Sequence, residues 1–420
     1  MLKAFTSAEG EPGNPELTYP LLDTIAQEAH TKEMPLQHAF YSAEEGSLEE
    51  EKLARSLAMG YMVLTADQLH KTKPEHQILL SDRYTTHTSE LYGTPEEHVA
   101  KQLVEQQAHA FRALGTNPHV DQNTLNNFLG TLESMSAPES GSNTTEFSEV
   151  ASQLKDVLYE RFGEALAVFD AVESSDQEAV TPEDAASLFN EAIAQLAEQN
   201  PAWSDWHAKV AAGEGMSTVA REQYFKIGTR GNYQTSRLKA LFGHEVLVHG
   251  LRSINGHETG DNLMQFGLPG NLDLEEGLGT MVEYALTGAI PDKNIDRYID
   301  VSLALGQNGR PALTRQQLHE LHTQRLVLRQ QAAGKSPDYD KLAKAAWNHV
   351  DRIYRGSLGT EVIGVNTKDI AYYQGFLKAA TYLKEELASK DMTTVYDYVM
   401  SGCFDPSDDR HRAYVQSLYN

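Results

Sequence analysis

The chain has 420 residues with 60 acidic and 35 basic side chains, and its formal charge of −25 weighs against nucleic acid or an anionic membrane as a partner, because both would be repelled over much of the surface. Its 40% hydrophobic and 23% charged residues are ordinary for a soluble globular protein. Cys403 is the single cysteine, which excludes an intrachain disulfide and a cysteine-based metal site. No stretch approaches the roughly 18 apolar residues of a membrane span, and Met1–Phe5 is not followed by a signal-peptide core. We therefore expect a cytoplasmic protein.

Residues 1–134 are predicted to form a helical N-terminal region. Apolar residues recur at three- and four-residue spacing from Glu44 to Leu69 and from Glu96 to Leu114, which is the pattern of helices that bury one face. Residues 135–146 are rich in Ser, Gly, Pro and Thr and are interpreted as a linker or a long surface loop. They mark a soft boundary, after which residues 147–420 are expected to form a second domain within one functional unit.

The second region opens with two predicted helices, Phe147 to Val172 and Thr181 to about Glu198. The latter begins with an N-cap threonine, a proline at the first position and acidic residues in the first turn. From Trp203 to Gly228 the pattern changes to short apolar runs around a Gly-rich turn, which predicts two or three strands of a small antiparallel sheet. The edge strand of such a sheet could pair with an extended peptide, although a plain core-covering hairpin is the alternative.

The residues that carry chemistry lie in a helix predicted over Ser236–Gly256, with Thr235 or Ser236 as N-cap. It contains His244, Glu245 and His249 in the pattern H-E-x-x-x-H, one residue longer than the H-E-x-x-H helix of familiar zinc proteases. Two imidazoles in one helix are a metal-ligand pair, and the adjacent carboxylate could act as a base.

The extra residue between the histidines poses a geometric problem. Five steps of roughly 100° would put His249 about 140° round the helix from His244, too far for both rings to reach one ion. A π-bulge takes up one residue and would bring both rings to one side. We therefore predict a local widening of the helix near Val246–Val248.

A third ligand is expected from a second helix, which is predicted from Asp273 as N-cap to Gly288 as terminator. Glu276 lies in its first turn, and two histidines with a glutamate form a catalytic zinc site that leaves the fourth position for water. Glu276 could instead be the capping-box partner of Asp273. If His249 is not a ligand, His257 is the fallback. Further helices are predicted over Thr314–Ala333, Tyr339–Ile353, Ile370–Glu386, Thr393–Met400 and Pro406–Leu418.

The runs H-E-V-L-V-H-G-L-R-S-I-N-G, G-L-P-G and E-E-G-L-G-T-M-V-E-Y resemble the family of metallohydrolases with an H-E-x-x-x-H helix and a Q-E-G-L-A motif, which includes the microtubule-associated tyrosine carboxypeptidases. Glu275 and Gly279 depart from the first and last positions of that motif, whereas the third ligand of the family falls on Glu276. Further matches lie at Leu91–Pro95, at Tyr354–Gly356 and from Thr367 to Gly375. The resemblance implies a mostly helical α+β fold, with a zincin-like metalloprotease core and a small antiparallel sheet in the catalytic domain over residues 147–420.

These features predict a zinc metallocarboxypeptidase that removes one C-terminal residue from a peptide or protein, and the resemblance suggests tyrosine or another aromatic residue. His244, His249 and Glu276 would hold Zn²⁺, and Glu245 would be the general base. The charge of −25 disfavours a strongly acidic polypeptide tail, so a substrate other than tubulin is favoured. Endopeptidase and aminopeptidase action stay open.

A carboxypeptidase must also bind the free carboxylate of its substrate through a cation. Arg355 and Lys368, with Tyr372 beside them, are the candidates for substrate binding. Arg230, Arg252 and Lys226 are the runners-up. The alternative function is a non-catalytic regulatory or interaction protein that retains a structural zinc site; a purely structural site has no use for a base such as Glu245 and usually takes four protein ligands.

Overall fold

The computed structural model describes residues 21–73, 77–133, 147–175, 177–213, 215–307, 311–356 and 364–418. The chain divides into two compact units: unit 1 comprises Met1–Ser142 and Asp292–Ile370, and unit 2 comprises Asn143–Pro291 and Ala371–Asn420. The predicted linker at 135–146 lies outside the described residues, and residues 292–370 group with the N-terminal helices. No described helix combines the length and apolarity that crossing a membrane requires.

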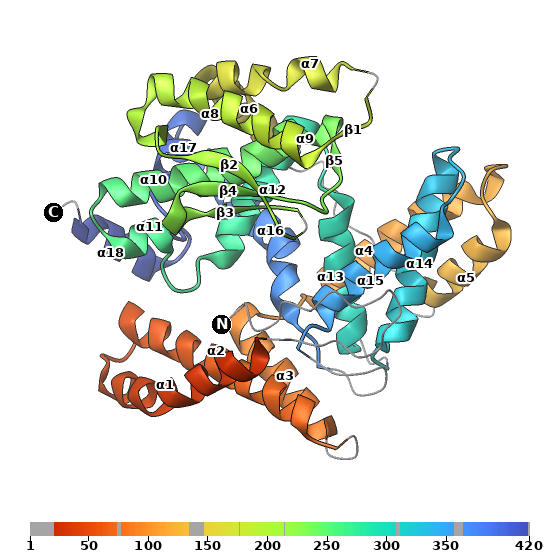
Figure 1. Ribbon diagram of the computed structural model, residues 1–420, viewed down its shortest axis with the longest axis horizontal. Coiled ribbons are helices and arrows are strands. Elements are labelled where there is room, and N and C mark those ends of the chain that lie inside the picture. The colour runs from red at the N-terminus through yellow and green to blue at the C-terminus, as the bar shows by residue number, and fades with distance from the viewer. Residues whose placement is uncertain are drawn as a thin grey trace. The chain divides into compact units, whose positions relative to one another are not determined.

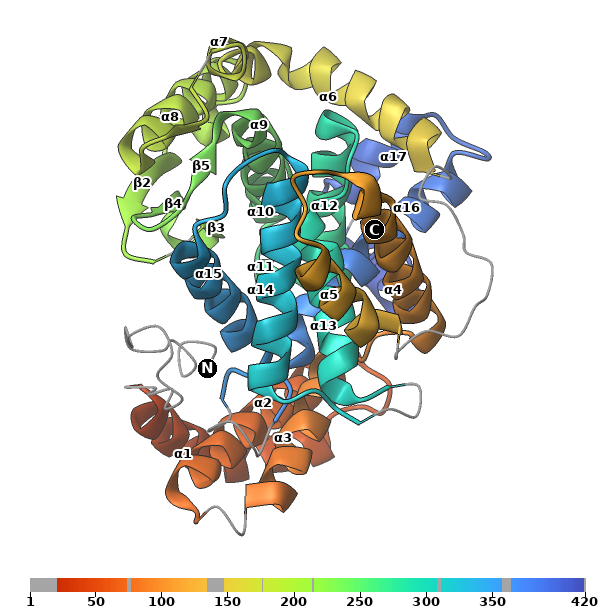
Figure 2. The same cartoon turned by 90° about the vertical axis from the view of Figure 1, so that its right-hand side faces the viewer.

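The regular elements of unit 1, within the residues that the structure describes, are helices. Figure 2 shows α14 lying between α15 and α5, and these helices bury mostly aliphatic side chains against one another. Ser47 caps the N-terminus of α2 by accepting a hydrogen bond from the amide of Glu50, and Thr314 forms a capping box with Gln317 at the start of α14. The elements are α1 (Leu22–Ser42), α2 (Leu48–Lys71), α3 (Gln77–Tyr92), α4 (Glu97–Arg112), η3 (Ala113–Thr116), α5 (Gln122–Glu133), α13 (Asp292–Leu305), α14 (Arg315–Ala332), α15 (Tyr339–Ile353) and η8 (Thr367–Ile370).

Unit 2 combines helices with the strands labelled in Figure 1, which pair into two small sheets, so the expected mostly helical α+β class is confirmed. Its helices are α6 (Ser148–Ala167), α7 (Asp170–Glu173), α8 (Pro182–Gln199), α9 (Thr235–His244), α10 (Leu251–Glu258), α11 (Asn262–Phe266), α12 (Leu272–Thr287), α16 (Ala371–Glu386), α17 (Met392–Val399) and α18 (Asp409–Leu418). The shorter turns are η5 (Pro201–Trp203), η6 (Ala220–Glu222) and η7 (Glu245–Gly250), and the strands are β1 (Ala179–Val180), β2 (His207–Ala211), β3 (Met216–Val219), β4 (Tyr224–Gly228) and β5 (Tyr233–Gln234).

The predicted sheet between Trp203 and Gly228 is present, but it is mixed. Its strand order is β2-β4-β3, in which β3 and β4 are antiparallel and β2 and β4 are parallel. The prediction of a purely antiparallel sheet was wrong for β2 and β4. The chain does not form a meander, because β4 lies between β2 and β3 and pairs with both. An antiparallel pair of β1 with β5 lies apart from it. Within the described sheet, β3 is an edge strand.

The inner face of the sheet packs on the helix that carries both histidines. Phe225 of β4 stacks near Trp206, with ring centroids 5.0 Å apart. A Cβ atom at Gly250 would lie 2.8 Å from the ring of Phe225 and 3.1 Å from that of Trp203, so the absence of a side chain there lets the helix approach the sheet. This contact fixes the distance between the edge strand and the histidines.

The second helix of the site, α12, is held by α16. A Cβ atom at Gly277 would collide with the carbonyl oxygen of Gly375, so the two backbones cross in direct contact. Helix α12 ends at Gly288 with φ of +75°, as predicted. It begins after Asn271, so Asp273 lies in the first turn and is not the N-cap that we expected.

Candidate metal centre

The helix with the H-E-x-x-x-H pattern widens where the sequence predicts. Helices α9 and α10 are joined by η7, a π-helical segment over Glu245–Gly250, so the predicted π-bulge is confirmed. The helix continues to Glu258, two residues beyond the end that we expected at Gly256. Gly256 is buried, and the backbone of Met264 packs against it.

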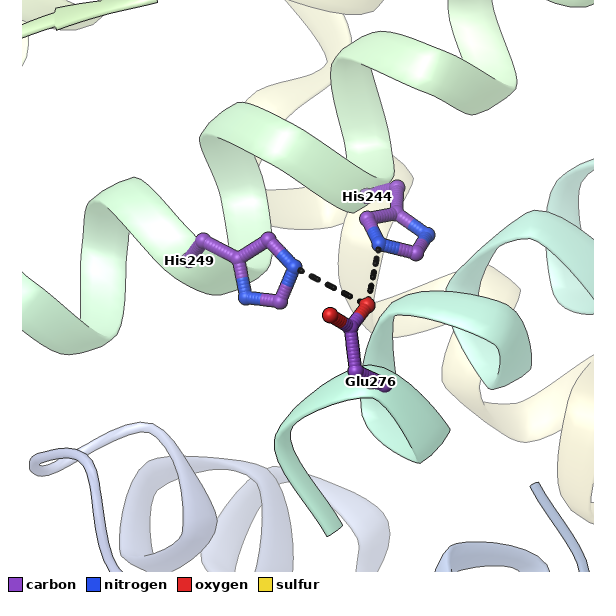
Figure 3. Close-up of side chains that lie close together, drawn as sticks. All are labelled: His244, His249 and Glu276. Carbon is purple, nitrogen blue, oxygen red and sulfur yellow. Dashed lines mark ion pairs between the residues drawn. The ribbon is translucent and has the colours of Figure 1, made fainter. Parts of the chain in front are cut away.

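Three potential metal ligands meet at this bulge. The Nε2 atoms of His244 and His249 lie 3.5 Å and 3.8 Å from Oε2 of Glu276, and Figure 3 shows both rings turned toward that carboxylate. Ligand atoms about 2.1 Å from a tetrahedral zinc ion are roughly 3.4 Å apart, so the residues fit such an ion. The predicted ligand set is brought together, and Glu276 is not reserved for capping Asp273.

The far side of each imidazole is also bonded. Nδ1 of His244 lies 2.8 Å from Oε1 of Glu283, and Nδ1 of His249 lies 2.7 Å from Oε1 of Glu275. Glu283 in turn pairs with Arg237, and Glu275 pairs with Arg252. Neither carboxylate was predicted from the sequence as a partner of the rings. A signal existed for one of them, since Glu283 follows Glu276 by seven residues and so lies on the same face of α12.

Burial lowers the pKa of His244, but the hydrogen bonds with Glu276 and Glu283 outweigh it and raise the pKa to about 10. Burial also opposes the charged form of His249, and Glu275 reverses that effect, so the pKa of His249 is raised. Burial raises and Arg252 lowers the pKa of Glu275, with a net lowering. The carboxylates thus make the centre attractive to a positive charge, whether a proton or a metal ion.

The predicted base, Glu245, points to the edge of the sheet. Oγ1 of Thr218, in the edge strand β3, lies 2.8 Å from Oε2 and 2.9 Å from the carbonyl oxygen of Glu245. The negative charge of Glu245 is among those that raise the pKa of His244. The base, the ligands and the edge strand therefore belong to one local assembly.

The residues predicted to bind the substrate carboxylate lie elsewhere in the chain. Arg355 belongs to unit 1, where its Nε donates to the carbonyl of Arg352 and its Nη2 lies 3.9 Å from Asp369. Lys368 lies in η8 of unit 1, and Tyr372 lies half-buried in α16 of unit 2. Their part in substrate binding stays a prediction.

Two of the secondary candidates are corrected. Arg252, a runner-up for the carboxylate, is wholly buried and donates to the carbonyls of Val399 and Phe404 as well as to Glu275, so it does not face a ligand from solvent. His257, the fallback ligand, is exposed and pairs with Gln265 at 3.3 Å, away from the three ligands.

A second cluster, Asp300, His322 and His349 in unit 1, has donor atoms near enough to share an ion. Both carboxylate oxygens of Asp300 already accept hydrogen bonds of 2.8 Å from Arg325, which also lies 2.8 Å from Nδ1 of His322. A guanidinium fills the place that a cation would take, so this cluster is a buried ion-pair network and does not fit a metal.

The cluster in unit 2, by contrast, is a group of three residues that could hold a metal ion, with the carboxylate of Glu245 next to it in sequence. The chain belongs to the microtubule-associated tyrosine carboxypeptidase family, whose model matches residues 121–300 and 338–405, more than half of the sequence. No curated protein matches the chain. No solved structure matches it either. Family membership indicates a carboxypeptidase that acts on a protein C-terminus.

Proposed function

We propose that this chain is a zinc-dependent carboxypeptidase of the cytoplasm that removes a C-terminal tyrosine or other aromatic residue from a protein. The observation that carries the proposal is the meeting of His244, His249 and Glu276 at a π-bulge that also begins with Glu245. A structural site would need neither an open ligand position nor a carboxylate held beside it.

His244, His249 and Glu276 would hold the ion. Zinc bound there would supply Lewis acidity toward water and the scissile carbonyl. Glu245 accepts a proton from the attacking water and passes it to the departing amine, acting as general base and then as general acid. Thr218 steadies the carboxylate of Glu245 during both transfers. The C–N bond breaks, the water oxygen becomes part of the new carboxylate, and the released residue leaves with its amine.

The edge strand β3 supports a zincin-like arrangement of substrate and site. An extended peptide can add to an exposed sheet edge through main-chain hydrogen bonds, with side-chain pockets supplying selectivity. Because Thr218 of β3 contacts Glu245, a peptide paired with β3 would lie beside the base. Arg355, Lys368 and Tyr372 are proposed to recognise the terminal carboxylate. Alanine substitution of the residue that binds this carboxylate would raise KM for peptides with a free C-terminus and leave zinc binding unchanged.

Mass spectrometry on a peptide mixture tests the function. The peptides would vary in the C-terminal residue, in upstream acidity and in whether the C-terminus is free or amidated, and they would be incubated with the zinc-loaded chain and with Glu245→Gln. We expect loss of one residue from free C-termini in the first sample only, with fewer cuts after acidic segments because of the net charge. Zinc binding without cleavage of any peptide would favour the non-catalytic regulatory protein instead.

A further inference from the structure

Each of the two histidines of the centre is held by a chain of two charged side chains. In one chain Arg237 pairs with Glu283, which bonds Nδ1 of His244. In the other, the wholly buried Arg252 pairs with Glu275, which bonds Nδ1 of His249. The chains reach the two rings on the side that faces away from Glu276.

These contacts determine which ring nitrogen can bind a metal. When Nδ1–H donates to a carboxylate, the lone pair of the neutral ring is on Nε2. In both rings Nε2 is the nitrogen that faces Glu276, at 3.5 Å for His244 and 3.8 Å for His249. The carboxylates therefore select the tautomer that the ligand geometry requires.

One helix supplies all three carboxylates. Glu275, Glu276 and Glu283 lie on α12, whose position is fixed by the backbone contact between Gly277 and Gly375 of α16. The third ligand and the partners of the two other ligands thus move together. This coupling favours an ion that takes all three ligands at once over one that binds the histidines alone.

The two chains differ in how they are anchored. Arg252 also donates to the carbonyls of Val399 and Phe404, so Glu275 is tied to the fold of the C-terminal segment. The side chain of Arg237 is 30% exposed, whereas that of Glu283 is buried. The Glu283 chain can therefore be altered at its outer end without opening the core.

We propose that Glu283 and Glu275 are positioning residues that orient His244 and His249 and thereby set the metal affinity of the centre, with Arg237 and Arg252 holding the carboxylates in place. The proposal rests on the proposed function in taking the centre as a zinc site. It assigns the four residues no contact with substrate.

The test measures metal binding by the full chain. Zinc affinity is determined by competition with a chromophoric chelator, and the ligand field by the visible spectrum of the cobalt(II) form. Glu283→Gln keeps the shape of the side chain but weakens its hold on Nδ1–H, and we expect zinc affinity to fall roughly 10- to 100-fold with a changed cobalt spectrum. Glu191→Gln, at an exposed position of α8, is the matched control and should bind as the wild type does.

The outer residue gives a second test that leaves the buried carboxylate in place. Arg237→Gln should weaken zinc binding less than Glu283→Gln does, and Arg237→Lys should restore most of the affinity. Wild-type affinity and spectrum in both Glu283→Gln and Arg237→Gln would overturn the proposal. If Glu283→Gln does not fold, the zinc affinities of Arg237→Gln and Arg237→Lys decide whether the proposal holds.

Peptide hydrolysis measured in parallel separates this proposal from the proposed function. Weakened binding in the variants, together with zinc-loaded wild type that cleaves no peptide, supports the positioning role and discards the carboxypeptidase. Cleaving wild type with unaffected zinc affinity in the variants discards the positioning role alone. A wild-type chain that binds no zinc overturns both.

Discussion

The imidazole of His244 packs directly on Gly279 of α12. A Cβ atom added at that glycine would lie 2.6 Å from Cε1 and 2.7 Å from both nitrogens of the ring. In this chain, which has glycine where the Q-E-G-L-A motif has alanine, Gly279→Ala must therefore push His244 away from Glu283 and out of line with Glu276. We expect zinc affinity to fall about tenfold or more, measured by chelator competition, because ligand orientation is lost.

The matched control for this change is Gly163→Ala in α6. No atom lies within 4 Å of a Cβ placed at Gly163, so alanine there should be neutral or should stabilise the helix by up to about 1 kcal/mol. Zinc binding that falls equally in both variants would show that the loss at Gly279 does not come from the ring of His244.

Thr218 and Glu245 allow the role of the base to be tested separately from metal binding. Thr218→Val keeps the volume of the side chain in β3 but removes the hydroxyl that bonds Oε2 of Glu245. With the proposed hydrolysis, kcat should fall about tenfold or more, a part of the 10²–10⁴-fold that a positioned base contributes, while KM and zinc affinity stay unchanged.

Two variants serve as controls for this prediction. Thr218→Ser restores a hydroxyl and should recover most of kcat. Ser217→Ala changes the neighbouring exposed position of the edge strand and should leave kcat as it is. An unchanged kcat in Thr218→Val would mean that Glu245 is oriented by other contacts.

The crossing of α12 with α16 predicts a stability effect that is independent of catalysis. Alanine at Gly277 would place a methyl group against the carbonyl of Gly375, and neither backbone can yield without separating the helices. We expect a loss of about 3 kcal/mol of folding free energy from this overpacking. Circular dichroism of metal-free protein on heating measures it, with Gly163→Ala as the reference, and equal midpoints for the two would contradict the close crossing.

The fold was predictable where structure is set by neighbours in sequence. Thr181 caps α8, as its capping residue predicted, and α14 begins after Thr314, where the spacing of apolar residues predicted a helix. The parallel pairing of β2 with β4 could not be predicted in this way. It places Lys209 opposite Lys226, with the strand β3 between them in sequence, and it depends on long-range packing. The end of the helix at Glu258 was also missed, because Gly256 was interpreted as a helix stop, whereas it is a buried position within the helix that packs against the backbone of Met264.

The candidate site also has features that the sequence could predict and features that it could not. His244 and His249 share a helix, so their spacing alone required a bulge, and η7 supplies it. Glu283 shares a face of α12 with Glu276, but its bond to His244 spans 39 residues of the chain, and the bond of Thr218 to Glu245 spans 27, so neither pairing could be predicted from neighbours in sequence. Glutamates and threonines are common in the chain, and which of them faces the site is decided by the tertiary packing of α12 and β3.

The buried network in unit 1 predicts a pH effect on stability. Burial, with the charges of His349 and Arg325, outweighs Asp300 and lowers the pKa of His322 from its ordinary value of 6.5 to about 3. The unfolded chain takes up a proton at His322 below pH 6.5, whereas the folded chain does not until about pH 3. The stability that depends on neutral His322 is complete above pH 6.5 and is lost as the pH falls from 6.5 toward 3.

At pH 5 the free energy of unfolding is lower by roughly 2 kcal/mol, which corresponds to an increase of about 30-fold in the equilibrium constant for opening of this region. Hydrogen exchange of peptides from α14 and α15, corrected for intrinsic rates, should show that decrease in protection between pH 7.5 and pH 5. His322→Gln keeps an acceptor for Arg325 but cannot take up a proton. Its protection should be lower at pH 7.5 and should change much less on acidification. The same acid sensitivity in His322→Gln would assign the effect to other groups.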